Sequence, residues 1–396
     1  MTLAGLTRDN RLLAFSLFFW GLGEGMFIYI EPLYLRELGA DPVAIGSILA
    51  AAAVAAGLAH VPAGYLADRF GRKPLLIAGW LLGLVTCLLM FLARDLRLFV
   101  PALIGYTFTT FVVSPINAYA AAARGPQSVQ RALTLVSAGF WGGTILSPAL
   151  GGWIARATEL RMVFGAAAIA FLLSTAAMLL LAAQPRSAPP TGDTRFGALL
   201  RNRRFLGFLL LTLVALLAMQ VGVPFMPNFV VEVRGFDVAL VGLLGSANSL
   251  GTVTLNLLLG QRLPRRGFML AQASLALALA LLLATTSRRW LFAVYFLRAG
   301  WFLAHSMVVA QVGRVVGAAE IGLAFGMTET VTALATVLGP LAAGVLYERG
   351  PALPFQVSLG LILLTLPLVW AYAPRRDAHT ETLVEATGRP SHDVQA

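Results

Sequence analysis

Long apolar runs separated by short polar joints follow one another along this chain of 396 residues. Twelve of the runs reach the length of about twenty residues that an α-helix needs to cross a bilayer. They cover approximately residues 11–35, 43–67, 74–93, 98–123, 131–155, 161–184, 204–231, 238–260, 267–287, 290–313, 321–347 and 353–373. The joints hold charges or turn formers, as in "LGADP" and "RGPQS". The pattern predicts an all-α membrane protein with twelve transmembrane helices.

The longest joint divides these segments into two sets of six. It reads "PRSAPPTGDTRFGALLRN" over residues 185–202, and its Pro, Ser and Gly content is typical of a linker. We therefore expect an N-terminal six-helix bundle in residues 1–184 and a C-terminal one in residues 203–374. The polar tail, residues 375–396, is expected to be disordered and cytoplasmic.

Composition and charge agree with a membrane protein. The chain is 58% hydrophobic and 12% charged, whereas soluble domains carry about 25% charge. The formal net charge of +11 does not indicate nucleic-acid binding, because the bases are scattered singly between apolar segments. Most of the 29 Lys and Arg residues fall in the N-terminus, the linker, the tail and alternate joints, which places those parts in the cytoplasm. We expect a multi-pass protein of a prokaryotic cytoplasmic (inner) membrane with both termini inside, and we name its two faces the predicted inner side and the predicted outer side.

Similar short motifs occur in both sets of helices, and the number of residues between the matching motifs is nearly constant. "DRFGRK" at 68–73 aligns with "QRLPRR" at 261–266, and "SPALGG" at 147–152 aligns with "GPLAAG" at 339–344. Tyr106 lies at the same offset before Arg298. The agreement indicates that the second six helices repeat the first, as in many transporters.

The word "GYLADRFGRKPLL", residues 64–76, resembles the signature between helices 2 and 3 of the major facilitator superfamily. The resemblance implies two pseudo-symmetric six-helix bundles around a central cavity, which is lined by helices 1, 4, 7 and 10 and works by alternating access. It also implies a gating latch at the predicted inner side, where Asp68 accepts hydrogen bonds from the start of helix 11, near Ile321. The latch comprises Asp68, Arg69, Gly71, Arg72 and Lys73. The alternative is a topology marker without a gating role.

A second word, "GTILSPALGG" at 143–152, is similar to the helix 5 signature of the drug/proton antiporters of that family, with Ser147 where the signature has Gly. Small residues let helices approach closely, and a proline bends a helix. The word therefore favours efflux or, alternatively, plain close packing of helices. The residues of this packing motif and of its repeat are Gly143, Pro148, Gly151, Gly152, Gly339 and Pro340.

Five ionisable residues lie within the predicted helices: Glu24, Glu31, Arg298, His305 and Glu329. A charge at the bilayer centre costs about 2.5–3.5 kcal/mol on insertion scales, so these groups should face the interior or water, pair, or stay neutral. The i, i+7 spacing predicts that Glu24 and Glu31 share one face of helix 1, and that Arg298 and His305 share one face of helix 10. Glu31 and Arg298 are expected to pair, and so are His305 and Glu329.

Glu24 is our first candidate for proton coupling, with Glu31 as the second. Glu24 lies about midway between Arg11 and Arg36, and its repeat counterpart is the neutral Gln220. A proton-coupled carrier needs such a carboxyl group, whose proton affinity changes as the cavity opens to each side. A structural hydrogen bond is the alternative role for Glu24. The candidate cavity residues are Glu24, Tyr29, Tyr106, Asn117, Gln220, Arg298 and His305.

Other chemistries have no signature in the sequence. There is no HExxH, Walker loop or GxSxG word, and Cys87 is the single cysteine, so we expect no enzyme, metal or cofactor. Our hypothesis is a monomeric secondary active transporter in the lipid bilayer, without a nucleic-acid partner, that exchanges protons for a hydrophobic or amphiphilic small molecule in multidrug-type efflux. The alternatives are an uptake symporter or facilitator for an organic anion or lipid-like metabolite, and a receptor or scaffold that transports nothing.

Overall fold

The computed structural model describes residues 5–184, 202–259, 264–312, 315–316 and 321–372, without the side chains of residues 61–68, 264–265, 321–322 and 372. The predicted tail and all but the last residue of the predicted linker fall outside these ranges. Within them every regular element is a helix. Eleven helices are long and apolar enough to cross a membrane, or twelve when a pair bent by 43° counts as one span. The prediction of an all-α, multi-pass membrane protein is confirmed.

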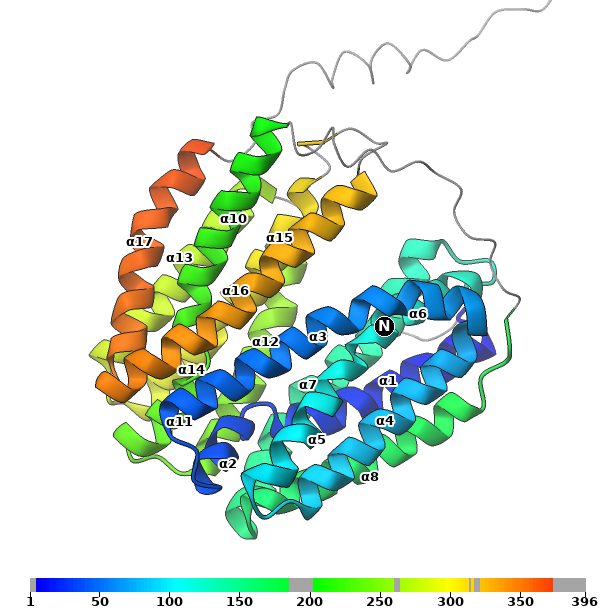
Figure 1. Ribbon diagram of the computed structural model, residues 1–396, viewed down its shortest axis with the longest axis horizontal. Helices are drawn as coiled ribbons and strands as arrows, with labels where there is room; N and C mark the ends of the chain where they lie inside the picture. Colours follow the sequence, from blue (N-terminus) through cyan, green and yellow to red (C-terminus); the bar gives the residue numbers. More distant parts are fainter. Residues whose placement is uncertain (1–4, 185–201, 260–263, 313–314, 317–320, 373–396) are drawn as a thin grey trace, which may run out of the picture.

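Among the described residues, the first half forms nine helical elements and the second half forms nine more (Figure 1). The first nine are α1 (Arg8–Phe27), α2 (Glu31–Glu37), α3 (Pro42–Phe70), α4 (Arg72–Leu92), α5 (Leu96–Phe108), η1 (Thr109–Val112), α6 (Val113–Ala122), α7 (Val129–Ala157) and α8 (Leu160–Leu179). The others are α10 (Arg203–Val221), α11 (Met226–Asn228), η2 (Phe229–Val233), α12 (Val238–Leu259), α13 (Pro264–Ala284), α14 (Arg288–Arg298), α15 (Gly300–Val312), α16 (Ile321–Arg349) and α17 (Leu353–Tyr372).

Side chains in the joints fix where several helices begin. Thr7, Asp95, Ser128 and Asn202 each accept a hydrogen bond from the backbone amide three residues further on, which satisfies one of the free amides of the first turn. Gly71 separates α3 from α4 with φ of 87°, a conformation that favours glycine. The polar joints noted in the sequence therefore act as helix caps as well as membrane-surface segments.

Four spans are interrupted within their length, and they are the first, fourth, seventh and tenth. The first bends at residues 28–30, and the fourth tightens into the 3₁₀ turn Thr109–Val112. The seventh breaks at residues 222–225 and continues through a π turn, and the tenth is divided at Ala299. Interrupted spans free backbone groups and commonly border binding sites in transporters.

The main contacts between the two halves are made by two pairs of helices, α7 with α12 and α3 with α16, and α2 also contacts α11. Gly152 of α7 lies so close to Gly242 of α12 that a Cβ on Gly152 would be 2.8 Å from the Gly242 Cα. On the other pair, Gly46 of α3 packs against the Pro340 carbonyl, and Gly344 packs against the Pro42 carbonyl. These contacts lie where α3 and α12 begin and where α7 and α16 end, which is the predicted outer side. At the opposite ends the halves diverge, as Figure 1 shows for α16 and α6.

The six residues of the packing motif lie at close helix contacts. Gly143 and Gly151 of α7 meet the carbonyls of Phe18 and Met26 in α1. Gly339 of α16 meets Gln220 of α10. Pro148, Gly152 and Pro340 contact helices of the opposite half. The positions agree with the close-packing interpretation of the motif, and the same arrangement recurs in both halves.

Candidate substrate site

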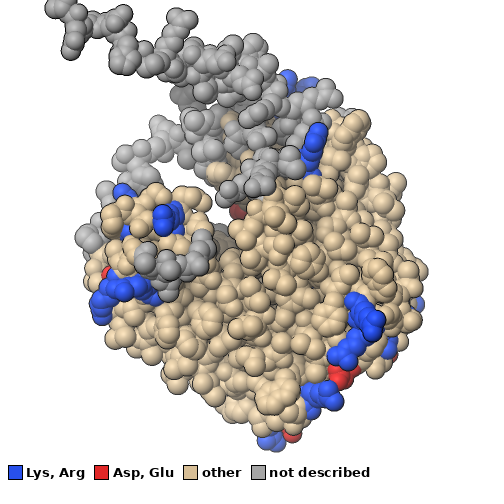
Figure 2. Space-filling model, turned by 180° about the vertical axis from the view of Figure 1, so that it is seen from behind, with Lys and Arg blue, Asp and Glu red and all other residues tan. Residues whose placement is uncertain are grey.

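A cavity of about 610 Å³ lies between the two halves. All four interrupted spans line it, together with parts of α3, α4, α7 and α16. Figure 2 shows a hollow between the halves, and it shows Lys and Arg gathered toward the two ends of the molecule with an uncharged belt between them. The volume is that of a site for a drug-sized molecule.

Six of the seven predicted cavity residues line this cavity: Glu24, Tyr29, Tyr106, Asn117, Gln220 and Arg298. Glu31 lines it as well. His305 is not among the lining residues, because the break at Ala299 ends the helical register that would place it on the face of Arg298. Its Nε2 lies 3.3 Å from Glu329 Oε2, so the predicted pairing of these two residues is confirmed.

Glu24 is held by two hydrogen-bond donors from the wall of the cavity. Trp20 Nε1, one turn earlier on α1, donates to Glu24 Oε2 at 3.2 Å. The Tyr106 hydroxyl, from α5, donates to the same oxygen at 3.0 Å. The other carboxyl oxygen, Oε1, has no partner among the described residues, so it is available to a proton or a ligand. Glu24 therefore makes the hydrogen bonds expected for a structural role, and its free oxygen is compatible with a proton-binding role as well.

An aromatic wall surrounds this carboxyl group. The Trp20 and Tyr106 rings are stacked with centroids 6.1 Å apart, and Phe171 stacks on Tyr106 at 5.7 Å. Trp80 packs on Trp20 at 4.8 Å. Trp141 of α7 also borders the cavity. Tyr106 was among the predicted cavity residues, whereas Trp20, Trp80 and Trp141 were not. The hydrogen bond from Trp20 to Glu24 is the contact that the sequence could have indicated, because the two residues have i, i+4 spacing within one helix.

Arg298 binds a different group from the one predicted. Its Nη1 donates to Asn248 Oδ1 at 2.7 Å, and its guanidinium lies over the rings of Tyr29 and Tyr295 at 5.3 and 5.7 Å. The Tyr29 hydroxyl donates to the same Asn248 oxygen at 2.8 Å. Arg298 and Glu31, which were predicted to pair, do not form an ion pair among the described residues. The bend between α1 and α2 separates the faces on which Tyr29 and Glu31 lie. Asn248 of α12 supplies Arg298 with an acceptor instead.

Asn248 is a buried residue of α12. Its amide oxygen joins a side chain of the first half, Tyr29, to one of the second half, Arg298. Gly245, one turn earlier on α12, leaves room for the Tyr29 ring. This polar junction therefore sits where the bend between α1 and α2 meets α12 at the border of the cavity.

The predicted latch is only partly described. The side chain of Asp68 and that of Ile321 at the start of α16 lie outside the described residues. The end of α3 and the start of α16 lie apart in Figure 1, and the latch stays a prediction. Arg72 instead donates to the Ala118 carbonyl at 3.2 Å and to Gln184 Oε1 at 3.1 Å, both in its own half.

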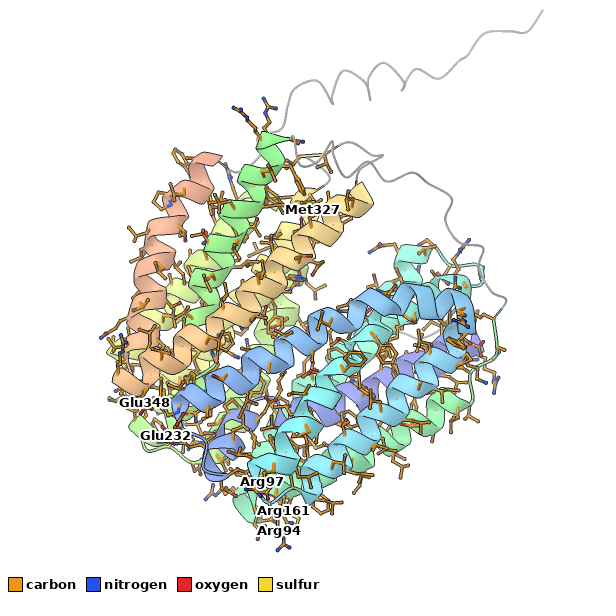
Figure 3. The ribbon with its side chains drawn as sticks, viewed as in Figure 1. Arg94, Arg97, Arg161, Glu232, Met327 and Glu348 are labelled. Carbon is orange, nitrogen blue, oxygen red and sulfur yellow. The ribbon has the colours of Figure 1, made fainter. Side chains whose placement is uncertain are left out.

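Ion pairs cross between the halves at the predicted outer side, and the sequence did not single them out. Arg36 Nε lies 3.6 Å from Glu232 Oε1, and Glu232 also accepts hydrogen bonds from Tyr347 and Asn228, both at 3.1 Å. Arg156 Nη1 lies 3.2 Å from Asp237 Oδ2. Figure 3 shows Glu232 at a corner of the molecule near Glu348, with Arg94, Arg97 and Arg161 of the first half at the next corner.

Comparisons with known proteins agree on one family. The model of the Major Facilitator Superfamily matches residues 13–261 and 208–394. Multidrug resistance protein 1 of Bacillus subtilis strain 168 is 24% identical over 373 residues, which cover 91% of this chain and 95% of that protein. The quinolone resistance protein NorA of Staphylococcus aureus strain MRSA252 is 23% identical over 375 residues, covering 90% and 95%. A solved structure of a mutant nucleoside transporter NupG has a TM-score of 0.80 at 16% identity, covering 92% of this chain and 100% of that one.

Proposed function

The chain belongs to the major facilitator superfamily and is a transporter, and on that premise we propose that it exports hydrophobic or amphiphilic small molecules in exchange for protons. We also propose that residues 1–184 and 203–374 move as two bundles in an inner membrane with both termini in the cytoplasm. The names of the relatives, a multidrug and a quinolone resistance protein, support efflux of more than one compound.

The observation that carries the proposal is the placement of Glu24. The carboxyl group lines the cavity near the middle of an interrupted span, with one oxygen held by Trp20 and Tyr106 and the other without a partner. A carboxyl group exposed to the open cavity can ionise in water and attract a cation. When the cavity closes and water leaves, the neutral form is favoured. Proton binding and release can thus alternate with the opening of the two sides.

The surrounding wall suits apolar and amphiphilic compounds. Trp20, Trp80, Tyr106 and Trp141 supply flat apolar surfaces that accept many ring shapes. Few directed donors or acceptors accompany them, so recognition depends on area and charge more than on a fixed hydrogen-bond pattern. This arrangement favours a broad substrate range over selection of one sugar.

The test is transport by Glu24→Gln in inverted vesicles. A glutamine oxygen can still accept from Trp20 and Tyr106, so we expect the variant to fold and to bind substrate. It should lose uptake driven by an imposed pH gradient and keep substrate-for-substrate exchange at equal pH, which needs no net proton movement. Glu37→Gln, at the exposed far end of α2, is the matched control and should behave as the unmodified protein.

Two results would contradict the proposal. Full gradient-driven transport by Glu24→Gln would move the proton site to Glu31, and full activity of Glu31→Gln as well would remove proton coupling through the first span. A protein that moves no compound in either assay would be a receptor or scaffold.

One observation favours a second candidate, transport of an organic anion. Arg298 lines the same cavity and carries a positive charge that no carboxylate among the described residues neutralises. Inward transport of an organic acid together with protons, abolished by Arg298→Gln, would support this alternative.

A further inference from the structure

A carboxyl group and a guanidinium line the cavity without contacting each other. Glu31 begins α2 and, among the described residues, has neither an ion pair nor a hydrogen bond to its side chain. Arg298 has partners, but all of them are neutral: the Asn248 oxygen and the rings of Tyr29 and Tyr295. The Arg298 Nε is buried and has no acceptor among the described residues. The cavity therefore presents a carboxyl group and a guanidinium that both lack a partner of opposite charge.

The two charges lie in the same part of the cavity. The Arg298 guanidinium is 5.3 Å from the centre of the Tyr29 ring, and Tyr29 precedes Glu31 by two residues. Two residues of chain span at most about 7 Å, so Glu31 and Arg298 border the same part of the cavity. No ion pair joins them among the described residues, so a ligand with two charged ends can lie between them.

An unpaired charge out of bulk water is unfavourable, and a ligand that supplies its counter-ion recovers that loss. A purely cationic ligand at Glu31 leaves Arg298 uncompensated, and a purely anionic ligand at Arg298 leaves Glu31 uncompensated. A ligand with both charges compensates both residues and adds no net charge to the cavity. Its rings can lie against the aromatic wall of Trp20, Trp80 and Trp141.

We propose that the cavity selects zwitterionic amphiphiles, with a protonated amine at Glu31, a carboxylate at Arg298 and an aromatic body between them. The proposal rests on the export function proposed above and names its substrate class. The proposal assigns different roles to the two acidic residues. Glu31 binds the cationic group of the ligand. Glu24, which accepts hydrogen bonds from Trp20 and Tyr106, carries the proton.

Three matched compounds test it. The zwitterion is 4′-(aminomethyl)biphenyl-4-carboxylic acid, its methyl ester is the cation, and its N-acetyl derivative is the anion. Binding is measured on the purified full chain by quenching of tryptophan fluorescence. We expect the zwitterion to bind at least about tenfold more tightly than either single ion, which corresponds to 1.4 kcal/mol.

Two variants separate the charges. Glu31→Gln should weaken binding of the zwitterion and the ester and leave the N-acetyl compound unchanged. Arg298→Gln should weaken binding of the zwitterion and the N-acetyl compound and leave the ester unchanged. If Arg298→Gln does not fold, Arg298→Lys keeps the charge without the planar guanidinium, and its affinity for the zwitterion should fall while that for the ester holds. The exposed Arg97→Gln is the control and should bind all three as before.

Equal or tighter binding of the ester than of the zwitterion would overturn the proposal, and so would failure of all three compounds to bind. Its failure is distinct from failure of the proposed export. If the ester is exported by a pH gradient and the zwitterion is not, export stands and the substrate class is wrong. If the zwitterion binds with the predicted dependence on both residues but no pH gradient drives it, the substrate class stands and proton coupling is wrong.

Discussion

Close packing at Gly242, more than any ion pair, should hold the halves together at the predicted outer side. A Cβ at Gly242 would collide with the Pro148 carbonyl oxygen and lie 2.8 Å from the Gly152 Cα. Both groups belong to the backbone of α7 and cannot rotate away. Overpacking of this kind costs about 1–3 kcal/mol. The cost arises only while α7 and α12 touch, so Gly242→Ala should lower the ratio of outer-closed to outer-open protein by about 5- to 150-fold.

The ion pairs at the same side should contribute less. The side chains of Arg36 and Glu232 are 47% and 30% exposed, and those of Arg156 and Asp237 are 67% and 49% exposed. Pairs in such exposed settings contribute about 0.2–1 kcal/mol. Arg156→Gln should therefore change the ratio by less than about fivefold.

Spin labels at Arg97 and Glu348, one in each half at the predicted outer side, report this ratio as a distance distribution (Figure 3). The buried Cys87 is replaced by alanine so that no other thiol is labelled. The control is Gly207→Ala, where no atom lies within 4 Å of the added carbon. An unchanged distribution in Gly242→Ala together with a large shift in Arg156→Gln would refute the ranking of packing above ion pairs.

Three further outcomes are expected. Asp68→Asn should increase the inward-open population, seen with labels at the inner ends of α3 and α16, and an unchanged distribution would rule out the latch. Arg298→Ala should lower the free energy of unfolding by about 1.5–3 kcal/mol, because a charge-assisted hydrogen bond is lost. Adding Glu31→Gln should not restore this free energy, because the two residues do not pair. Melting curves of the single and double variants measure both effects. Ser174→Ala should lower the free energy of unfolding by about 1–3 kcal/mol, since the buried Ser174 hydroxyl accepts from Trp80 at 2.7 Å and donates to the Ser16 carbonyl at 2.6 Å. Melting curves measure this change, and an unchanged free energy would mean that these hydrogen bonds are dispensable.

The spans were predictable because their signal is local. Length and hydrophobicity decide whether a segment crosses a bilayer, so the predicted segment 43–67 and the helix α3 (Pro42–Phe70) agree closely. The interruptions were not predicted. Gly222 and Pro224 weaken the seventh span locally, but the fourth span changes to a 3₁₀ turn over "TTFV", which contains neither glycine nor proline. At that place the packing of neighbouring helices determines the backbone conformation, and this packing cannot be read from the local sequence.

The site shows the same division between local and distant information. The Trp20 and Glu24 contact follows from helical spacing within one helix, whereas Tyr106 reaches Glu24 from 82 residues further along the chain. Whether Arg298 meets Glu31 or Asn248 depends on the approach of helices from opposite halves. Hydrophobic pattern and charge count are the same for both partners, so the sequence predicted six of the seven cavity residues but not the partner of Arg298.

The junction at Asn248 connects opening of the outer side to the charge of the cavity. Its oxygen binds Tyr29 of the first half and Arg298 of the second, and the Tyr29 ring lies against the guanidinium. In an alternating-access cycle, α12 must move away from α1 when the predicted outer side opens. Arg298 then loses the Tyr29 ring and keeps only contacts within its own half, so its guanidinium becomes more accessible to water. A carboxylate bound there loses the low-dielectric setting that strengthens the interaction. Opening of the outer side should therefore weaken binding at the cationic end of the site, which is the direction that release of an exported molecule requires.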